Sequence, residues 1–153
     1  MPDKVFIDTN VLIYGYSEDE PDKRQRAIDC VGSGEAWIST QVLNETINVL
    51  KRKFSLSYSQ IRDAVQELSE GFPIVLVSVN TIEMALNLAE RYQYSYFDSL
   101  ILASALEAGC QILYSEDLQP TFRTLSVTTS QKRKGRESKY LSRGVSWRQA
   151  ASN

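Results

Sequence analysis

The chain has 153 residues, 42% hydrophobic and 24% charged, with a formal net charge of −2. These values are typical of one globular domain, and no apolar run approaches the roughly 20 residues that would span a bilayer. Histidine is absent, which excludes catalysis by imidazole. The N-terminus has no apolar signal stretch, so we expect a cytoplasmic protein. The two cysteines of the chain, Cys30 and Cys110, are expected to be free, buried thiols.

Charge is unevenly distributed along the chain. Residues 1–120 hold nine Lys/Arg and eighteen acids, whereas residues 121–153 hold eight Lys/Arg and one acid. The basic tail indicates an anionic partner, or contact between the tail and its own acidic body. Because residues 130–153 show no apolar period, we predict a domain over residues 1–129 and a basic, partly disordered extension over residues 130–153.

Apolar periodicity predicts strands and helices that alternate along the domain. In chain order they are strand 4–7, helix 10–16, helix 21–31, strand 36–38, helix 40–54, helix 58–71, strand 74–79, helix 81–92, helix 96–108, strand 111–114 and a last candidate strand, 125–128. Ser57 with Gln60 and Asn80 with Glu83 have capping-box spacing, and Gly109 suits the end of a helix. This alternation predicts an α/β fold with three layers and a central, mostly parallel sheet.

Two acids follow predicted strands. Asp8 comes directly after strand 4–7, and Asp117 comes shortly after strand 111–114. Ligands of open α/β sheets bind beyond the carboxyl ends of the strands, so parallel neighbours would place both carboxylates on one rim. An acid after a strand is also a common helix cap, and this alternative stays open.

A third acid, Asp98, lies in the first turn of a predicted helix. At 100° per residue, Ile101, Leu102 and Ala105 share its face, so Asp98 occupies an apolar stripe. A lone carboxylate there is costly unless it is paired or bound to a metal. The alternative is an acid that complements the helix dipole.

The fourth acid, Glu45, lies near the edge of the apolar arc of helix 40–54 and by itself is typical of a solvated flank. Four acids near one rim would repel one another strongly unless cations were present. Since no histidine is available, the set indicates hard metal ions with oxygen ligands, such as Mg²⁺ or Mn²⁺.

Four stretches carry these acids: FIDTNVLIY at residues 6–14, STQVLNE at 39–45, SYFDSLI at 95–101 and LYSEDL at 113–118. In this order they resemble the PIN-domain nucleases, most closely the VapC-type toxins of bacterial toxin–antitoxin pairs. The resemblance implies a PIN-like fold and a metal-dependent ribonuclease. The positions matching its acidic, catalytic and metal-binding site are Asp8, Glu45, Asp98 and Asp117. The positions matching its polar supports are Thr9, Asn10 and Ser115.

The resemblance also implies a homodimer and a cognate antitoxin whose tail covers the site. The predicted reaction is hydrolysis of RNA phosphodiester bonds, with one or two Mg²⁺ or Mn²⁺ ions lowering the pKa of a bound water. Asp8 and Asp98 are expected to be the central ligands. The chain departs from the family's pattern after Asp117, because residues 130–153 extend beyond the last expected strand. An RNA-binding or partner-binding role for this extension stays a hypothesis.

An acidic site needs basic side chains around it to hold RNA. The candidate substrate contacts are Lys51, Arg52 and Lys53, and a second basic run spans residues 23–26. Both runs are also typical of solvated helix faces or favourable charge at helix ends. The aromatic residues at 94, 96 and 97 could stack on unpaired bases, although aromatics beside a helix start are more often core.

Two other functions fit parts of the sequence. An aspartyl-phosphate phosphohydrolase would use Asp8 as its nucleophile. Proteins of that class normally carry a second acid two places later, where this chain has Asn10. A non-catalytic PIN-like RNA-binding module would keep the fold without turnover, but the intact set of four acids argues against it.

Overall fold

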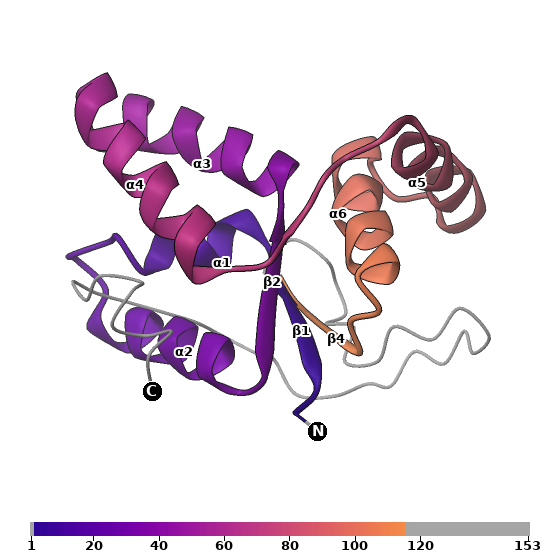
Figure 1. Cartoon of the computed structure of the whole chain (residues 1–153), viewed down its shortest axis with the longest axis horizontal. Coiled ribbons are helices and arrows are strands. Elements are labelled where there is room, and N and C mark those ends of the chain that lie inside the picture. The colour runs from indigo at the N-terminus through magenta and orange to yellow at the C-terminus, as the bar shows by residue number, and fades with distance from the viewer. Residues whose placement is uncertain (1, 116–153) are drawn as a thin grey trace.

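Residues 2–115 are described by the computed structural model, and they form an alternating series of strands and helices (Figure 1). The elements in chain order are β1 (Lys4–Ile7), α1 (Thr9–Tyr14), α2 (Pro21–Gly32), β2 (Glu35–Ser39), α3 (Thr40–Arg52), α4 (Tyr58–Gly71), β3 (Ile74–Val75), α5 (Val79–Tyr92), α6 (Tyr96–Glu107) and β4 (Ile112–Tyr114). The predicted strand 125–128 and extension 130–153 lie outside the described residues.

The four described strands form one parallel sheet in the order β3-β2-β1-β4. β1 is central, with Val5 paired to Ala36 of β2 and to Ile112 of β4. The apolar residues of β1 are fully buried because helices cover both faces of the sheet. The predicted α/β class with a parallel sheet is therefore confirmed.

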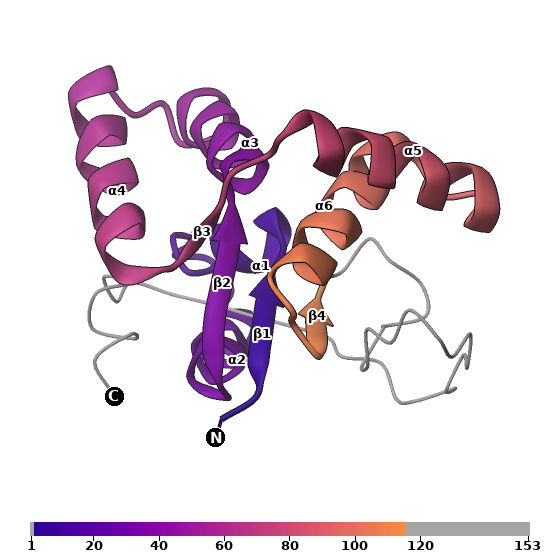
Figure 2. The same cartoon turned by 45° about the vertical axis from the view of Figure 1, so that its right-hand side comes forward.

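Helices α1 to α4 lie on one side of the sheet, and α5 with α6 lies on the other (Figures 1 and 2). The main core includes residues of β1, β2 and β4 and the sheet-facing residues of α6. A smaller cluster joins α5 to the opposite face of α6, through Ala85, Leu100 and Ala103. This arrangement confirms the expected three layers.

Local capping signals set most helix boundaries. Ser39 caps α3, and Ser57 forms the predicted capping box with Gln60 at the start of α4. Ser95 caps α6, and Gly109 follows that helix with φ +71°, a backbone conformation that favours glycine. These boundaries agree with the sequence prediction to within one or two residues.

The prediction for strand 74–79 was wrong. β3 ends at Val75. Two residues later, the backbone N–H of Val77 donates to the Thr40 hydroxyl oxygen at 3.1 Å. Ser78 then caps α5 in a capping box with Thr81, two residues earlier than the expected Asn80 cap. The chain turns away from the sheet so early that Leu76 is 73% exposed. Apolar character alone therefore gave the wrong strand end.

Cys30 and Cys110 are free and buried, as predicted. Burial raises the pKa of the Cys30 thiol to about 12 and that of Cys110 to about 11. Both thiols are consequently protonated and unreactive near neutral pH. Among the described helices, the longest have 14 residues, and none is long and apolar enough to cross a membrane.

Candidate functional site

Asp8 lies where β1 ends and is 5% exposed. Its backbone N–H donates to the Tyr114 carbonyl oxygen at 3.0 Å, which continues the parallel pairing of β1 with β4. One carboxylate oxygen, Oδ1, accepts from the Thr9 N–H at 2.6 Å, and the other, Oδ2, accepts from the Ser115 hydroxyl at 2.5 Å. Asp8 therefore caps α1, which is the alternative role that the sequence left open for it. It also lies beside Ser115 on the predicted rim.

Glu45 faces α1 from the second turn of α3. Its Oε2 atom accepts a hydrogen bond from the Thr9 hydroxyl at 2.5 Å, and its Oε1 atom accepts from Gln41 Nε2 at 3.0 Å. The side chain is half-buried, so Glu45 is not the solvated flank that its helical position suggested. Thr9 binds Asp8 through its backbone and Glu45 through its side chain. We call Asp8 and Glu45 the acidic pair, and Thr9 the threonine bridge between them.

Asp98 is half-buried in the first turn of α6, and its backbone N–H donates to the Ser95 hydroxyl at 3.2 Å. Because β4 follows α6 and runs parallel to β1, this first turn lies at the carboxyl-end side of the sheet (Figure 2). However, residues 99–105 are all buried, on the faces toward both the sheet and α5. α6 thus has no single apolar stripe, and helical phase does not distinguish Asp98 as the sequence argument assumed.

The structure brings together some of the four predicted acids but not all of them. Asp8 and Glu45 are joined through Thr9, Asp98 lies toward the same end of the sheet, and Asp117 lies outside the described residues. Asn10 is half-buried in the first turn of α1. Across residues 2–115, no group of three or more His, Cys, Asp and Glu side chains is arranged to hold a metal ion. The full four-acid centre remains a prediction.

The donors that orient Asp8 and Glu45 suit a site for a hard cation. The donors to Glu45, the Thr9 hydroxyl and the Gln41 amide, are both neutral, so they orient this carboxylate without cancelling its charge. A carboxylate has about four acceptor positions, and these two bonds leave others available on Glu45. Carboxylate oxygens are the ligands that Mg²⁺ and Mn²⁺ prefer, so the residues present fit such an ion.

The predicted basic contacts Lys51, Arg52 and Lys53 lie at the far end of α3. They are six to eight residues beyond Glu45, about 9–12 Å along the helix axis. Lys51 donates to the Leu56 carbonyl oxygen at 3.2 Å and lies 4.4 Å from the centre of the Tyr58 ring. All three are exposed, but the run is remote from the acidic pair.

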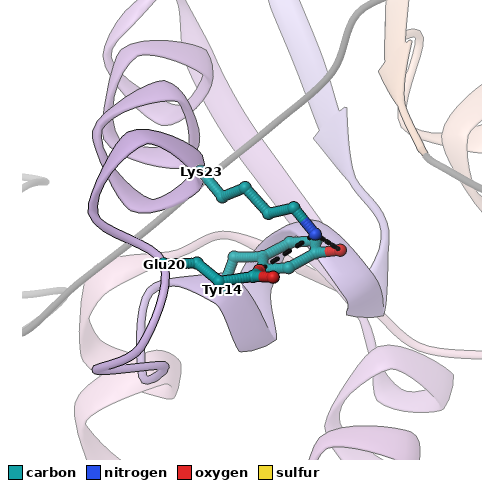
Figure 3. Close-up of polar contacts among 3 residues, drawn as sticks. All are labelled: Tyr14, Glu20 and Lys23. Carbon is teal, nitrogen blue, oxygen red and sulfur yellow. Dashed lines mark hydrogen bonds and ion pairs between the residues drawn. The ribbon is translucent and has the colours of Figure 1, made fainter.

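Lys23, the first residue of the second basic run, forms a separate polar cluster with Tyr14 and Glu20 (Figure 3). Lys23 Nζ lies 2.9 Å from Glu20 Oε2, donates to the Tyr14 hydroxyl at 3.1 Å and stands 4.6 Å from the Tyr14 ring centre. Its hydrogen bond to Glu20, and then that to Tyr14, raise the pKa of Lys23 well above its ordinary value. This Lys23 cluster ties the end of α1 to the start of α2.

The aromatic residues near Asp98 divide into two groups. Tyr94 packs against the main core, and Tyr96 packs against the cluster between α5 and α6. Phe97 makes an edge contact with Tyr96, with ring centres 5.4 Å apart, yet it is 59% exposed. The core interpretation therefore fits the two tyrosines, and Phe97 presents an exposed ring directly before Asp98.

Comparisons with known proteins agree with this fold. The sequence profile of the PIN domain family matches residues 5–125, so the chain belongs to the PIN domain family. Nucleases of this family generally use divalent metal ions. No curated protein sequence matches the chain.

Two solved structures are similar to the chain. One is a toxin–antitoxin complex from Klebsiella pneumoniae, with 24% identity, a TM-score of 0.57 and coverage of 72% of this chain and 84% of that chain. The other is VapC20 of Mycobacterium tuberculosis, a toxin that cleaves the sarcin–ricin loop, with 22% identity, a TM-score of 0.61 and coverage of 74% and 91%. At these identities the likeness supports the fold.

Proposed function

We propose that this chain is a divalent-metal-dependent ribonuclease and the toxin of a toxin–antitoxin pair. Membership of the PIN domain family supports the nuclease class. The two similar structures, one of a toxin–antitoxin complex and one of an RNA-cleaving toxin, support the more specific assignment. Cleavage would hydrolyse a phosphodiester bond of RNA.

The observation that carries this proposal is the pairing of Asp8 with Glu45 through Thr9. Two carboxylates from distant segments meet at the carboxyl end of the central strand, where α/β folds bind their ligands. Asp8 and Glu45 would hold Mg²⁺ or Mn²⁺ together with Asp98 and Asp117. The bound ion would supply a Lewis acid that lowers the pKa of a coordinated water to make a nucleophile near neutral pH.

The remaining side chains of the site orient these ligands. The Thr9 N–H and the Ser115 hydroxyl hold separate oxygens of Asp8, and the Thr9 hydroxyl holds Glu45. Each bond restricts a carboxylate that would otherwise sample several rotamers. Asn10 is proposed as a further polar support at the start of α1.

RNA would approach the acidic pair from the carboxyl end of the sheet. The exposed Phe97 ring offers a stacking surface for an unpaired base beside Asp98. The basic run at the end of α3 is exposed, so it can contact phosphates. Because this run is remote from the acidic pair, Lys51, Arg52 and Lys53 are candidates for phosphate contacts farther along the RNA. A homodimer and a cognate antitoxin complete the proposal, and the mass of the purified protein by light scattering tests the homodimer.

The direct test is cleavage of RNA by the purified chain with Mg²⁺ or Mn²⁺, with EDTA, and with Asp8→Asn as the matched variant. Asparagine also caps helices well, so this variant should fold. We expect cleavage that requires the metal and falls at least about 100-fold in the variant, because second-shell changes alone cost roughly 10–100-fold. Sequencing RNA ends after a brief pulse of expression would then identify the target.

Three results would contradict the proposal. Cleavage by Asp8→Asn equal to wild type would exclude the metal site, and tight RNA binding without turnover in either metal would favour a non-catalytic module. A covalent phosphate on Asp8 would instead indicate the aspartyl-phosphate phosphohydrolase class.

A further inference from the structure

We propose that Gln41 is a positioning residue, which holds the Glu45 carboxylate in the orientation that binds the metal ion. This inference rests on the proposed function and adds a residue to its site. Gln41 does not bind the ion or the RNA in this proposal. It acts through Glu45 alone.

The geometry places Gln41 on the same face of α3 as Glu45, four residues earlier. Ser39 caps α3 and Thr40 is its first residue, so Gln41 lies in the first turn, at the carboxyl end of β2. Its Nε2 atom donates to Glu45 Oε1 at 3.0 Å, while the Thr9 hydroxyl donates to Glu45 Oε2. The two oxygens of one carboxylate are therefore held by donors from two different helices.

This two-point attachment fixes the plane of the carboxylate. A single hydrogen bond would leave the Glu45 side chain free to rotate about the bonded oxygen, and an unrestrained glutamate loses considerable rotamer freedom on binding an ion. With both oxygens oriented, much of that entropy is already lost before the ion arrives. The carboxylate keeps acceptor positions for the ion, since each oxygen can accept more than one bond.

The neutral charge of Gln41 is essential to this role. An amide orients the carboxylate without neutralising it, so the negative charge stays available to a cation. A lysine at the same position would also donate to Glu45, but its ammonium group would compete with the ion. The Lys23–Glu20 pair shows this alternative within the same chain, at 2.9 Å.

The chain contains a matched pair that serves as a control. Gln66 Nε2 donates to Glu70 Oε1 at 3.0 Å, also across one helical turn, but on the exposed surface of α4. The two pairs have the same chemistry and spacing, and differ in their surroundings. Any effect of losing a Gln–Glu bond on helix stability should appear at both positions, and an effect on metal binding should appear at Gln41 alone.

The experiment compares Gln41→Met with Gln66→Met, because methionine keeps the length and helix preference of glutamine and removes the donor. Mn²⁺ is titrated by calorimetry into each full-length protein without RNA. We expect Gln41→Met to weaken Mn²⁺ binding about tenfold, as changes behind a metal ligand commonly do, and Gln66→Met to leave it unchanged. At saturating Mn²⁺, RNA cleavage by Gln41→Met should approach that of wild type.

A second variant separates positioning of Glu45 from a merely structural role. Gln41→Lys retains a donor to Glu45. If Gln41 had only a structural role, this variant would therefore bind Mn²⁺ more tightly than Gln41→Met. The positioning role predicts that Mn²⁺ binds more weakly to Gln41→Lys than to Gln41→Met. Thermal unfolding without metal checks that both variants fold.

The outcomes distinguish this inference from the proposed function. If wild type cleaves RNA and Gln41→Met binds Mn²⁺ as tightly as wild type, the role of Gln41 is overturned and the nuclease assignment stands. If wild type binds Mn²⁺ but does not cleave RNA, the nuclease assignment falls, and the titrations still decide the role of Gln41. If wild type binds no Mn²⁺, both are overturned.

Discussion

The two ends of one six-residue helix, α1, belong to two polar clusters. Each cluster contains a glutamate, and the clusters differ in the charge of the groups that bind it. At its start, Thr9 bridges Asp8 and Glu45 with neutral donors. At its end, Lys23 joins Tyr14 to Glu20, so the glutamate there has a cation from the chain itself. In the first cluster neutral donors orient the Glu45 carboxylate, whereas in the second the Lys23 ammonium neutralises Glu20. The proposed metal site predicts this difference, because a site for an external cation needs a glutamate that the chain's own lysines do not neutralise.

The largest effect expected from this difference comes from the same substitution in each cluster. Glu45→Gln removes a proposed metal ligand and should lower RNA cleavage at least about 100-fold, because even residues behind such ligands contribute roughly 10–100-fold. Glu20→Gln should leave cleavage unchanged, since Glu20 already has its own cation. Initial rates at fixed Mn²⁺ measure both. Equal losses in the two variants would remove the distinction between the clusters.

Metal binding should also stabilise the fold through the first cluster. At 100 times its Kd, Mn²⁺ should raise the free energy of unfolding of wild type by about 2.7 kcal/mol. The increase should be lost in Glu45→Gln and retained in Glu20→Gln. Urea unfolding with and without Mn²⁺ provides the measurement. A similar increase in all three proteins would mean that the ion binds elsewhere.

The threonine bridge should contribute less than the acids that it joins. Thr9→Val keeps the shape of the side chain but removes the hydroxyl that donates to Glu45, so we expect a loss of cleavage of about tenfold, the lower end of second-shell effects. Thr9→Ser retains the hydroxyl and should recover most of the activity. If valine and serine behave alike, the bond to Glu45 does not support catalysis.

Local sequence signals account for much of this fold. The apolar run of β1, the Ser57–Gln60 capping box and the glycine after α6 each act within a few residues, so they could be predicted. The end of β3 could not be predicted from apolar character. The Thr40 hydroxyl takes the Val77 N–H, and the Ser78 cap then starts α5.

The candidate site depends on contacts that the sequence does not specify. Thr9 and Glu45 are 36 residues apart, and Ser115 and Asp8 are 107 apart. Their meeting requires the parallel order of the strands, which is a property of the whole sheet. Residue types and strand ends indicated Asp8 correctly as a rim residue. They gave Glu45 no partner, although its spacing of four from Gln41 was visible.

The smallest effect should come from the Lys23 cluster, and it should affect stability alone. The Lys23 and Glu20 side chains are 39% and 42% exposed, so water screens their attraction, and Lys23→Met should cost less than about 1 kcal/mol of unfolding free energy. RNA cleavage should be unchanged.

This contribution has a defined pH dependence. Glu20 and then Tyr14 raise the pKa of Lys23 above its ordinary value of 10.5. The unfolded chain therefore loses this proton at lower pH than the folded chain, so the stabilisation is fully present below pH 10.5 and declines as the pH rises through the folded-state value. Urea unfolding of wild type and Lys23→Met at about pH 8 and about pH 11 should show the difference between them shrinking at the higher pH. A constant difference would mean that Lys23 stabilises the protein by packing on the Tyr14 ring rather than by its charge.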